Sequence, residues 1–460
     1  MIVSVILAAG EGTRMKSDIS KLCHTLLRKP MLNYVATASS KAGIEKNIVI
    51  VNEKNRPIIE QTIEIPNAVF EIQRIGEGIP YGTGYAVKLG MGHVSDEDQV
   101  LILNGDIPLL KAESLRSLIE HHLASGAAGT LMTAFMDDPY GYGRIVKDEE
   151  GYLKAIVEHR DADEKTLAIK EWNPGIYLFN GKLLKEALEE LDADNDQGEL
   201  YITDVVHILS TRGHKLATYP VADAGEVFGI NSKDQLAEAE ELLRKRVNTE
   251  YMKQGVIMEN PATILIEPGV AIGRDTRIGM GVSITGRTSI GAHCSITGDT
   301  HIHNAQIGDR VVIRSSDIES SEVGDDTDIG PYARLRPGAV LGQQVHIGNF
   351  VEVKNSKMGN KTKAGHLAYI GDADLGADIN VGCGVVFVNY DGVKKHRSTV
   401  EDGAFIGSNA NIVSPVHIET DGFVAAGSTI TRDVEKGALA ITRPEEKHIL
   451  DWVYIKKKKH

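Results

Sequence analysis

Apolar and polar residues alternate along the first 230 residues in a pattern that predicts strands separated by helices. Mostly apolar runs, which are typical of buried strands, occupy residues 2–9, 47–51, 100–103, 130–135 and 175–179. Segments with helical spacing lie between some of these runs, at residues 112–123 and 182–191. We expect a mostly parallel sheet covered by helices, a Rossmann-like α/β domain whose strand ends carry the ligand-binding loops.

The second half of the chain follows a different period. Aliphatic residues recur every six positions in three series, which run from Ile266 to Ile302, from Ile329 to Val353 and from Ile406 to Ile430. A period of six fits neither a helix nor a sandwich with loops of varied length. It predicts a parallel β-helix of hexapeptide repeats, with one aliphatic side chain pointing inward from each flat face. Two five-residue steps, after Ile302 and after Val353, need local bulges.

A helix is predicted between the two halves. Ser232 and Gln235 have the spacing of a capping box, and Leu236, Leu243 and Val247 share one helical face. We therefore expect a first domain at residues 1–230, a linker helix at 231–250, a β-helix at 251–445 and a basic C-terminal tail at 446–460.

One polar and basic segment, residues 388–402, interrupts the repeat. Its sequence Asn389-Tyr390-Asp391-Gly392 has turn chemistry, so we expect a loop that projects from the coil. Loops on rigid scaffolds often carry function.

Composition excludes several classes of partner. The net charge is −14, whereas nucleic acids and anionic membranes select basic faces. The three cysteines show no CxxC spacing, which favours neither a disulfide framework nor a zinc site and suits a reducing compartment. No apolar stretch approaches the roughly 20 residues that span a bilayer. We expect a cytoplasmic protein that binds neither nucleic acid nor membrane, with Lys456 to Lys459 as a solvated tail.

A glycine loop follows the first predicted strand. The backbone N–H groups of Gly10-Glu11-Gly12, at the start of a helix, are suited to hold an anion. Arg14 and Lys21 follow closely, and cations are needed where charge develops on a transferring phosphoryl group. The loop therefore predicts nucleotidyl transfer rather than binding of a redox cofactor.

Residues 7–15 with Lys21 resemble the signature of sugar-1-phosphate nucleotidyltransferases. Further matching motifs follow in order at residues 73, 82–84, 104–108, 141–146, 156–159, 171–175, 201–204 and 229–231. With the hexapeptide half, the chain resembles, over roughly residues 1–445, the bacterial bifunctional N-acetylglucosamine-1-phosphate uridyltransferase / glucosamine-1-phosphate acetyltransferase family.

The resemblance implies a homotrimer with a left-handed β-helix and two linked reactions. Acetyl-CoA acetylates glucosamine-1-phosphate, and UTP then converts N-acetylglucosamine-1-phosphate into UDP-N-acetylglucosamine and pyrophosphate. The product is a precursor of peptidoglycan and other cell-wall polymers.

The resemblance also assigns residues of the first domain. Asp106 and Asn231 are implied to hold Mg²⁺, which prefers oxygen ligands, and Arg14 and Lys21 to be catalytic. Gly143, Glu158 and Asn173 are implied to hold the N-acetylated sugar. The full set implied to bind UTP or UDP-N-acetylglucosamine is Leu7, Ala8, Ala9, Gly10, Lys21, Gln73, Gly82, Thr83, Gly143, Glu158, Asn173 and Asn231.

In the second domain, His366 is the candidate base for the amine proton, because histidine titrates in the required range. Arg336 and Lys354 suit a phosphomonoester dianion. With Tyr369 and Asn380 they are implied to bind glucosamine-1-phosphate, while Asn389 helps to orient it and Tyr390 borders the sugar. The residues implied to contact acetyl-CoA are Asn389, Tyr390, Ser408, Ala426 and Arg443.

Five residues also have a purely structural interpretation, in which they take no part in binding or catalysis. Asp106 is then a turn residue, Asn231 a helix-start residue, Glu158 part of a surface pair, His366 a surface histidine, and Cys383 a small buried residue rather than an acyl carrier. The chain also departs from the family pattern at Ser20, at the longer stretch 74–81, at Pro174 and at residues 385–387.

Two alternatives remain for the whole protein. In the first, a single nucleotidyltransferase uses its β-helix only for oligomerisation or regulation; His366, Asn389 and the pair Arg336/Lys354 argue against it. In the second, the chain is a non-catalytic interaction protein; the presence of Arg14, Lys21 and Asp106 argues against it.

Overall fold

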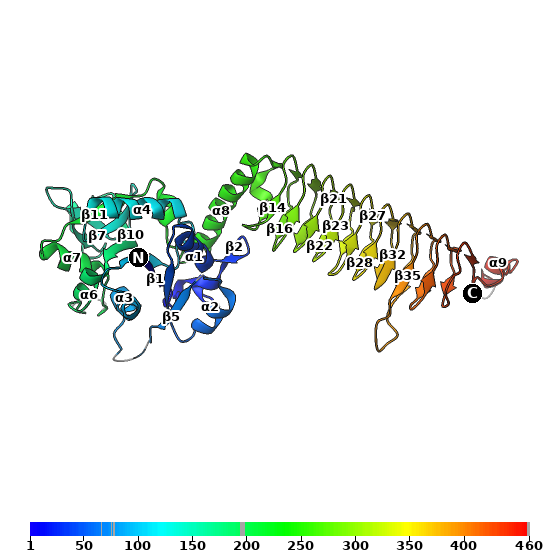
Figure 1. Ribbon diagram of the computed structural model, residues 1–460, viewed down its shortest axis with the longest axis horizontal. Helices are drawn as coiled ribbons and strands as arrows, with labels where there is room; N and C mark the ends of the chain where they lie inside the picture. The colour runs from blue at the N-terminus through cyan, green and yellow to red at the C-terminus, as the bar shows by residue number, and fades with distance from the viewer. Residues whose placement is uncertain (66, 75, 77–78, 194–197, 458–460) are drawn as a thin grey trace. The chain divides into compact units, whose positions relative to one another are not determined.

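The protein is described by a computed structural model that covers residues 1–65, 67–74, 76, 79–193 and 198–457 (Figure 1). The chain forms two compact units, Met1–Leu243 and Arg244–His460. Helix α8 (Lys233–Lys253) contains the division between them. Among the helices of the described residues, none has both the length and the apolarity that a membrane crossing requires.

The first unit is built on one sheet whose strand order is β11-β7-β10-β6-β1-β4-β5. Strand β10 is antiparallel to both of its neighbours, and the other pairs along this path are parallel, which confirms the predicted mostly parallel sheet. The strands are β1 (Ile2–Leu7), β4 (Lys46–Val51), β5 (Ala68–Ile72), β6 (Gln99–Asn104), β7 (Gly129–Phe135), β8 (Arg144–Lys147), β9 (Leu153–Val157), β10 (Glu171–Asn180) and β11 (Leu216–Pro220). A separate hairpin joins β2 (Thr25–Leu26) and β3 (Lys29–Pro30).

Two hydrophobic cores lie on opposite faces of this sheet. In β1, Ile6 belongs to the core shared with α1 and α4, while Val3 and Val5 belong to the core shared with α3, α6 and α7. Both faces of the strand are therefore buried, which explains why its residues are apolar except for Ser4. The helices are α1 (Met31–Lys41), α2 (Arg56–Thr62), α3 (Thr83–Gly90), α4 (Ala112–Ser125), α5 (Glu164–Leu167), α6 (Gly181–Leu188) and α7 (Thr203–Thr211). The short 3₁₀ helices of this unit are η1 (Thr13–Met15), η2 (Lys21–Cys23), η3 (Met91–His93) and η4 (Ala224–Val227), and η5 (Pro261–Thr263) lies in the second unit.

The start of α8 differs in detail from the predicted capping box. The Gln235 side chain accepts a hydrogen bond from the backbone N–H of Asn231 at 2.7 Å, one residue before the predicted donor, Ser232. This contact ties the first turn of α8 to Asn231, which lies in the candidate site described below.

The second unit is a left-handed parallel β-helix with three sheets of 11, 10 and 9 strands. The first sheet holds β12 (Ile257–Met258), β15 (Arg277–Ile278), β18 (Ser295–Thr297), β21 (Val312–Arg314), β24 (Asp328–Ile329), β27 (His346–Asn349), β30 (Lys363–His366), β33 (Asn380–Val381), β36 (Phe405–Ile406), β39 (Phe423–Val424) and β41 (Leu439–Ala440). The second holds β13 (Leu265–Ile266), β16 (Ser283–Thr285), β19 (His301–His303), β22 (Asp317–Glu319), β25 (Arg334–Leu335), β28 (Glu352–Lys354), β31 (Tyr369–Gly371), β34 (Val386–Val388), β37 (Asn411–Val413) and β40 (Thr429–Ile430). The third holds β14 (Ala271–Ile272), β17 (Ser289–Ile290), β20 (Gln306–Ile307), β23 (Glu322–Val323), β26 (Val340–Leu341), β29 (Lys357–Met358), β32 (Ala373–Leu375), β35 (Ser398–Val400) and β38 (His417–Ile418).

The six-residue series forms the core of this β-helix. Its aliphatic side chains are buried in one continuous cluster, except that Ile272 is only partly buried. Coils stack in register, so that Ile278 pairs with Ile296 on the next coil. The five-residue steps after Ile302 and Val353 are accommodated at corners, where Asn304 and Asn355 have positive φ angles.

The predicted projecting loop is shorter than residues 388–402. It leaves the coil after β34 and returns at β35, so the loop itself is residues 389–397 (Figure 1). The chain returns at this point because Ser398 and Val400 are both buried in the coil, each with 1% of its surface exposed. At the C-terminal end of the described residues, helix α9 (Trp452–Lys457) contains the first lysines of the predicted tail; the tail's residues 458–460 lie outside the described residues.

Gly348 and Gly365 lie side by side on successive coils, but replacing each by alanine should affect stability very differently. A Cβ on Gly348 would lie 1.8 Å from the carbonyl oxygen of Gly365 on the next coil, whereas a Cβ on Gly365 would meet nothing within 4 Å. We expect Gly348→Ala to force the two coils apart and to cost on the order of 3 kcal/mol of stability. Gly365→Ala is the matched control and should leave the melting temperature of the β-helix nearly unchanged. Equal melting temperatures of the two variants would contradict this packing.

Candidate active sites

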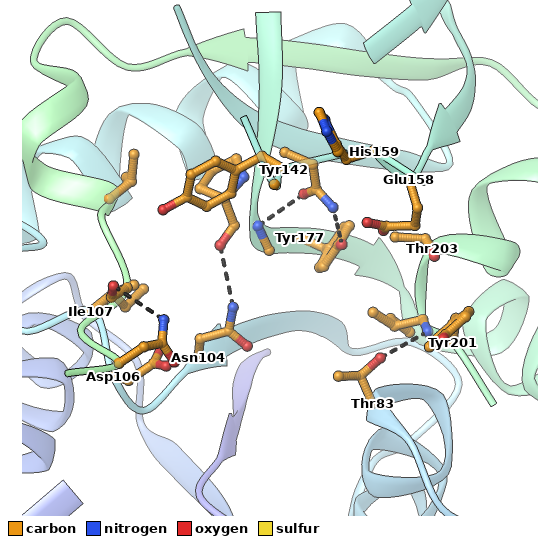
Figure 2. A pocket seen from close by; sticks show the side chains of 18 of the residues that line it. Thr83, Asn104, Asp106, Ile107, Tyr142, Glu158, His159, Tyr177, Tyr201 and Thr203 are labelled. Atoms are coloured by element: carbon orange, nitrogen blue, oxygen red, sulfur yellow. Dashed lines mark hydrogen bonds between the residues drawn. The ribbon is translucent and has the colours of Figure 1, made fainter. Parts of the chain in front are cut away.

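Two adjoining cavities open beside the carboxyl ends of β1 and β6 in the first unit. The smaller, of about 330 Å³, is lined by Leu7, Ala9, Gly10, Lys21, Leu22, Gln73, Tyr81, Gly82, Thr83, Ala86, Asn104, Asp106 and Glu199. The larger, of about 620 Å³, shares Thr83, Asn104 and Asp106 with the smaller one, and Figure 2 shows these residues with Glu158, Tyr177 and Tyr201. The structure therefore places most of the residues predicted for the nucleotide in one cavity, and Glu158, Asn173 and Asn231 in the other.

The glycine loop packs directly against Lys21. Gly12 has a φ of 64°, and a Cβ at this position would lie 2.6 Å from the Cβ of Lys21. Only glycine combines this conformation with so close an approach. The second glycine of the motif therefore brings the loop against the lysine that follows it.

Lys21, Asp106 and Asn231 form one polar cluster. The Lys21 ammonium donates hydrogen bonds to Asp106 Oδ2 at 2.5 Å and to Asn231 Oδ1 at 2.6 Å. Asp106 lies just beyond Gly105, which follows β6, and its carbonyl accepts a hydrogen bond from the N–H of Ile230 at 2.9 Å, which brings Asn231 beside it. Two oxygen atoms thus converge on one cation, and oxygen is the atom that Mg²⁺ prefers as a ligand.

The described residues contain no group of three or more histidine, cysteine or acidic side chains suited to a metal ion. A metal ion between Asp106 and Asn231 would therefore need further oxygens, and a bound polyphosphate offers them.

Arg14, Ala8 and Gly143 do not line these cavities. Arg14 is exposed on η1. Burial, and then the negative charge of Asp106, raise the pKa of Tyr142, whereas the positive charge of Arg14 lowers it, so Arg14 lies near this tyrosine. Ala8 is buried, with its carbonyl bound to the Asn55 side chain at 2.8 Å. Gly143 accepts a hydrogen bond from the N–H of Asn173 at 2.9 Å, so it supports a cavity residue from behind.

The larger cavity contains a carboxylate in an unfavourable environment. Burial, followed by the negative charges of Asp161 and Asp204, raises the pKa of Glu158. Nearby, the Asn173 side chain donates to the Tyr177 hydroxyl at 2.9 Å and accepts from the N–H of Gly175 at 2.8 Å. Asn173 is therefore held in one orientation, while Glu158 is available to accept hydrogen bonds from a polyol.

The raised pKa of Glu158 predicts a pH-dependent stability change in Glu158→Gln. Below the usual glutamate pKa of about 4.3 the side chain is neutral in both folded and unfolded states, so it costs nothing. Above its raised pKa the folded state must hold an ionised buried carboxylate, which opposes folding. In ligand-free protein we expect Glu158→Gln to raise the melting temperature at pH 8 but not at pH 4. The exposed Glu149→Gln is the control, and an equal shift at both pH values would contradict the assignment.

Several cavity residues were not predicted as site residues. Tyr81 and Glu199 line the smaller cavity, and Tyr201 and Thr203 line the larger one. The family motif at residues 201–204 pointed to this part of the cavity. Nothing in the neighbouring sequence, however, indicates that the backbone beside the motif contacts the turn at residues 82–84. The contact is made by Leu200, whose carbonyl accepts from the N–H of Gly84 at 2.8 Å.

Two departures from the family pattern fit the backbone. Ser20 has φ −51° and ψ 134°, a conformation close to that of proline, so the loop keeps its course. Pro174 lies at an irregularity in β10 between Trp172 and Ile176, where a missing N–H breaks no ladder bond. The longer stretch 74–81 lies partly outside the described residues, at positions 75, 77 and 78.

In the β-helix, a column of side chains follows one corner. Each member lies two residues after the inward-facing residue of its coil, and these inward-facing residues pair in register from coil to coil. Neighbouring coils are about 4.8 Å apart, so the column runs along the length of the β-helix. Its members are Asn349, His366, Cys383, Ser408 and Ala426, and the Arg443 side chain lies beside the next residue, Gly427.

Asn349 orients His366 within this column. Its Oδ1 lies 2.7 Å from Nδ1 of the exposed His366 ring. With a carbonyl oxygen as partner, Nδ1 carries the proton and Nε2 keeps a free lone pair, the form that a general base needs. Asn380 is exposed on the same sheet at the start of β33, and Cys383 is half-buried, more exposed than the small buried residue predicted.

A second group lies at the ends of β25 and β28, in the middle of the second sheet. Arg336 pairs with Glu352 at 2.8 Å, and Lys354 ends the neighbouring strand β28. Lys395, from the projecting loop, approaches Lys354, and this contact, then burial, then the charge of Arg336 lower the pKa of Lys354. Cations that lie this close together repel one another, and a bound anion would relieve that repulsion. Lys395 was not predicted, because its contact depends on how the loop folds back.

The base of the projecting loop holds Asn389 and Tyr390. Asn389 is buried, while Tyr390 is 56% exposed and its hydroxyl donates to the Gly392 carbonyl at 2.7 Å. Backbone N–H groups and the His396 ring bind Asp391 and lower its pKa to about 2, which fixes the turn. Residues 385–387, where the sequence departs from the family, include Val385 and Phe387 with no exposed surface, so they fill the core beneath the loop.

Comparison with known proteins matches both units. The family model for nucleotidyl transferases matches residues 3–226, and the model for the GMPPB C-terminal domain matches residues 261–363. The chain is 44% identical to the "Bifunctional protein GlmU" of Clostridioides difficile (strain 630), over 99% of this chain and 98% of the relative. It is 45% identical to the proteins of the same name from Geobacillus thermodenitrificans (96% and 95% covered) and Caldicellulosiruptor saccharolyticus (98% and 97% covered).

Proposed function

This chain belongs to the family of bifunctional GlmU proteins, and we propose how its two units divide the two reactions of a uridyltransferase and acetyltransferase. The first unit transfers a uridylyl group from UTP to N-acetylglucosamine-1-phosphate. The second transfers an acetyl group from acetyl-CoA to glucosamine-1-phosphate. The observation that carries this division is that each unit has its own polar site, centred on Lys21–Asp106–Asn231 in one and on His366 in the other.

For uridylyl transfer, the sugar phosphate attacks the α-phosphorus of UTP and pyrophosphate leaves, so no protein nucleophile is needed. The smaller cavity binds the nucleotide through Leu7, Ala9, Gly10, Gln73, Gly82 and Thr83, with Ala8 behind it. Gly143, Glu158 and Asn173 hold the sugar. Arg14 and Lys21 stabilise the negative charge that develops on the phosphates.

Asp106 and Asn231 fit Mg²⁺, because their oxygens already converge on the Lys21 ammonium as a stand-in cation. When bound, the ion would neutralise the triphosphate and the leaving pyrophosphate. Lys21 then donates to the phosphates instead of to these two side chains.

For acetyl transfer, the amine nitrogen of glucosamine-1-phosphate attacks the thioester carbonyl, the C–S bond breaks, and coenzyme A leaves as a thiolate that takes up the proton released from the amine. His366 Nε2 takes the amine proton. Arg336 and Lys354 hold the phosphate, and Tyr369 and Asn380 hold the sugar. The acetyl-CoA residues are Asn389, Tyr390, Ser408, Ala426 and Arg443.

We further propose a cytoplasmic homotrimer. The column that contains His366 and the cationic group at Arg336 and Lys354 lie at different corners of the coil, so a pocket enclosing both substrates needs another wall. A neighbouring copy about a threefold axis supplies that wall.

One assay tests both activities. The protein is incubated with glucosamine-1-phosphate, acetyl-CoA, UTP and Mg²⁺, and free thiol and pyrophosphate are followed separately. We expect thiol release without UTP, and pyrophosphate release only when acetyl-CoA or N-acetylglucosamine-1-phosphate is also present. Pyrophosphate without thiol would instead support a nucleotidyltransferase whose β-helix has no catalytic role.

A further inference from the structure

Asp372 joins three neighbouring coils beside the candidate acetyltransferase site. It forms the corner between β31 and β32, with a φ of 50°, and only 6% of its surface is exposed. Its backbone N–H donates to the Lys354 carbonyl, and its carbonyl accepts from the N–H of Ser398, both at 3.1 Å. Its side chain is thus buried between the cationic group and the base of the projecting loop.

Both carboxylate oxygens of Asp372 are bound by side-chain amides. Oδ1 accepts from Asn355 Nδ2 and Oδ2 accepts from Asn389 Nδ2, each at 2.5 Å. A buried carboxylate is costly unless donors surround it, and these two bonds supply them. The same bonds constrain the two amides in return.

The constraint on Asn389 has a chemical direction. An ionised carboxylate only accepts hydrogen bonds, so the Asn389 amide must turn its NH₂ group toward Asp372. That NH₂ group also lies 3.4 Å from the Tyr369 hydroxyl. Within the described part of the chain, no hydrogen bond reaches Asn389 Oδ1. The carbonyl oxygen is therefore the end of the amide that remains for a ligand.

We propose that Asp372 is a positioning residue for acetyl transfer, which fixes the Asn389 amide so that its carbonyl oxygen accepts a hydrogen bond from the substrate amine. This inference rests on the proposed acetyltransferase function. An amine attacks through its lone pair, and an acceptor on one of its N–H bonds sets where the lone pair points. Asp372 itself is buried and acts only through Asn389.

The first test is Asp372→Asn in the full-length protein. An amide at this position can donate or accept, so it no longer dictates which end of Asn389 faces the substrate. Misorientation of a reacting group costs up to about 10²-fold, so we expect the kcat of thiol release to fall roughly 10- to 100-fold. We expect KM for glucosamine-1-phosphate to change much less, and pyrophosphate release to stay at the wild-type rate.

Asp378→Asn is the matched control, because Asp378 is an exposed aspartate at another corner with a φ of 55°. It carries the same chemical change in the same backbone conformation. It should leave the kcat of thiol release unchanged.

A double-mutant cycle with Asn389→Ala separates positioning from a purely structural role. If Asp372 acts through Asn389, Asp372→Asn should have almost no further effect on kcat in the Asn389→Ala background. An equal loss in both backgrounds would overturn the proposal, as would full activity of the single variant Asp372→Asn. Absence of thiol release from the wild-type protein would instead reject the acetyltransferase function on which the proposal rests.

Discussion

Replacing His366 by alanine should lower the rate of thiol release from acetyl-CoA by about 10²- to 10⁴-fold, the usual contribution of a general base. The amine of glucosamine-1-phosphate must lose a proton as it attacks, and His366 Nε2 is the free lone pair that the bond to Asn349 leaves available. The same variant should release pyrophosphate from supplied N-acetylglucosamine-1-phosphate and UTP at the wild-type rate. Both rates are measured on one preparation of the protein.

His301→Ala is the control for this prediction. His301 is also exposed on the β-helix, on strand β19, but it lies outside the column of His366. Its replacement should leave both rates unchanged. Wild-type thiol release by a folded His366→Ala protein would contradict the assigned base.

Asp106→Ala should have the reverse effect and lower pyrophosphate release by at least about 10²- to 10³-fold. The substitution removes one of the two oxygens that converge on Lys21, and with it the carboxylate that would hold the Mg²⁺ whose positive charge neutralises the phosphates. Thiol release should continue at the wild-type rate, because the residues proposed for acetyl transfer lie in the other unit.

Asp137→Ala provides the matched control in the same unit. Asp137 is an exposed carboxylate that pairs with Lys170 on the surface, away from both cavities. It should leave pyrophosphate release unchanged. A loss of both activities in Asp106→Ala protein that remains folded would contradict the separation into two sites.

Much of the fold could be predicted because apolar residues recur at regular intervals along the sequence. The aliphatic side chains of the six-residue series are buried in the core of the β-helix, with Ile272 partly buried, so the sequence pattern predicts the coil directly. In the first unit, the predicted strands are the ones with apolar side chains on both faces. Strand β5 was not predicted, because all of its residues, from Ala68 to Ile72, are only partly buried at the edge of the sheet and its pattern is correspondingly weak.

The candidate sites were predictable where neighbours in sequence are neighbours in space. The glycine loop with Arg14 and Lys21 is such a case. The contacts of Asn349 with His366 and of Asp372 with Asn389 are different, because each joins residues 17 positions apart on successive coils. The corners and the inserted loop determine which residues face each other on successive coils. No local sequence pattern predicts this register.

The most direct test of the central claim, that two independent sites in one chain act in sequence, is a mixing experiment. His366→Ala and Asp106→Ala proteins are each supplied with glucosamine-1-phosphate, acetyl-CoA, UTP and Mg²⁺, first alone and then together, and UDP-N-acetylglucosamine is measured. We predict almost no product from either variant alone and sustained production from the mixture, because one variant makes the intermediate that the other consumes. A mixture that forms no product, although each variant retains its own half-reaction, would contradict the account.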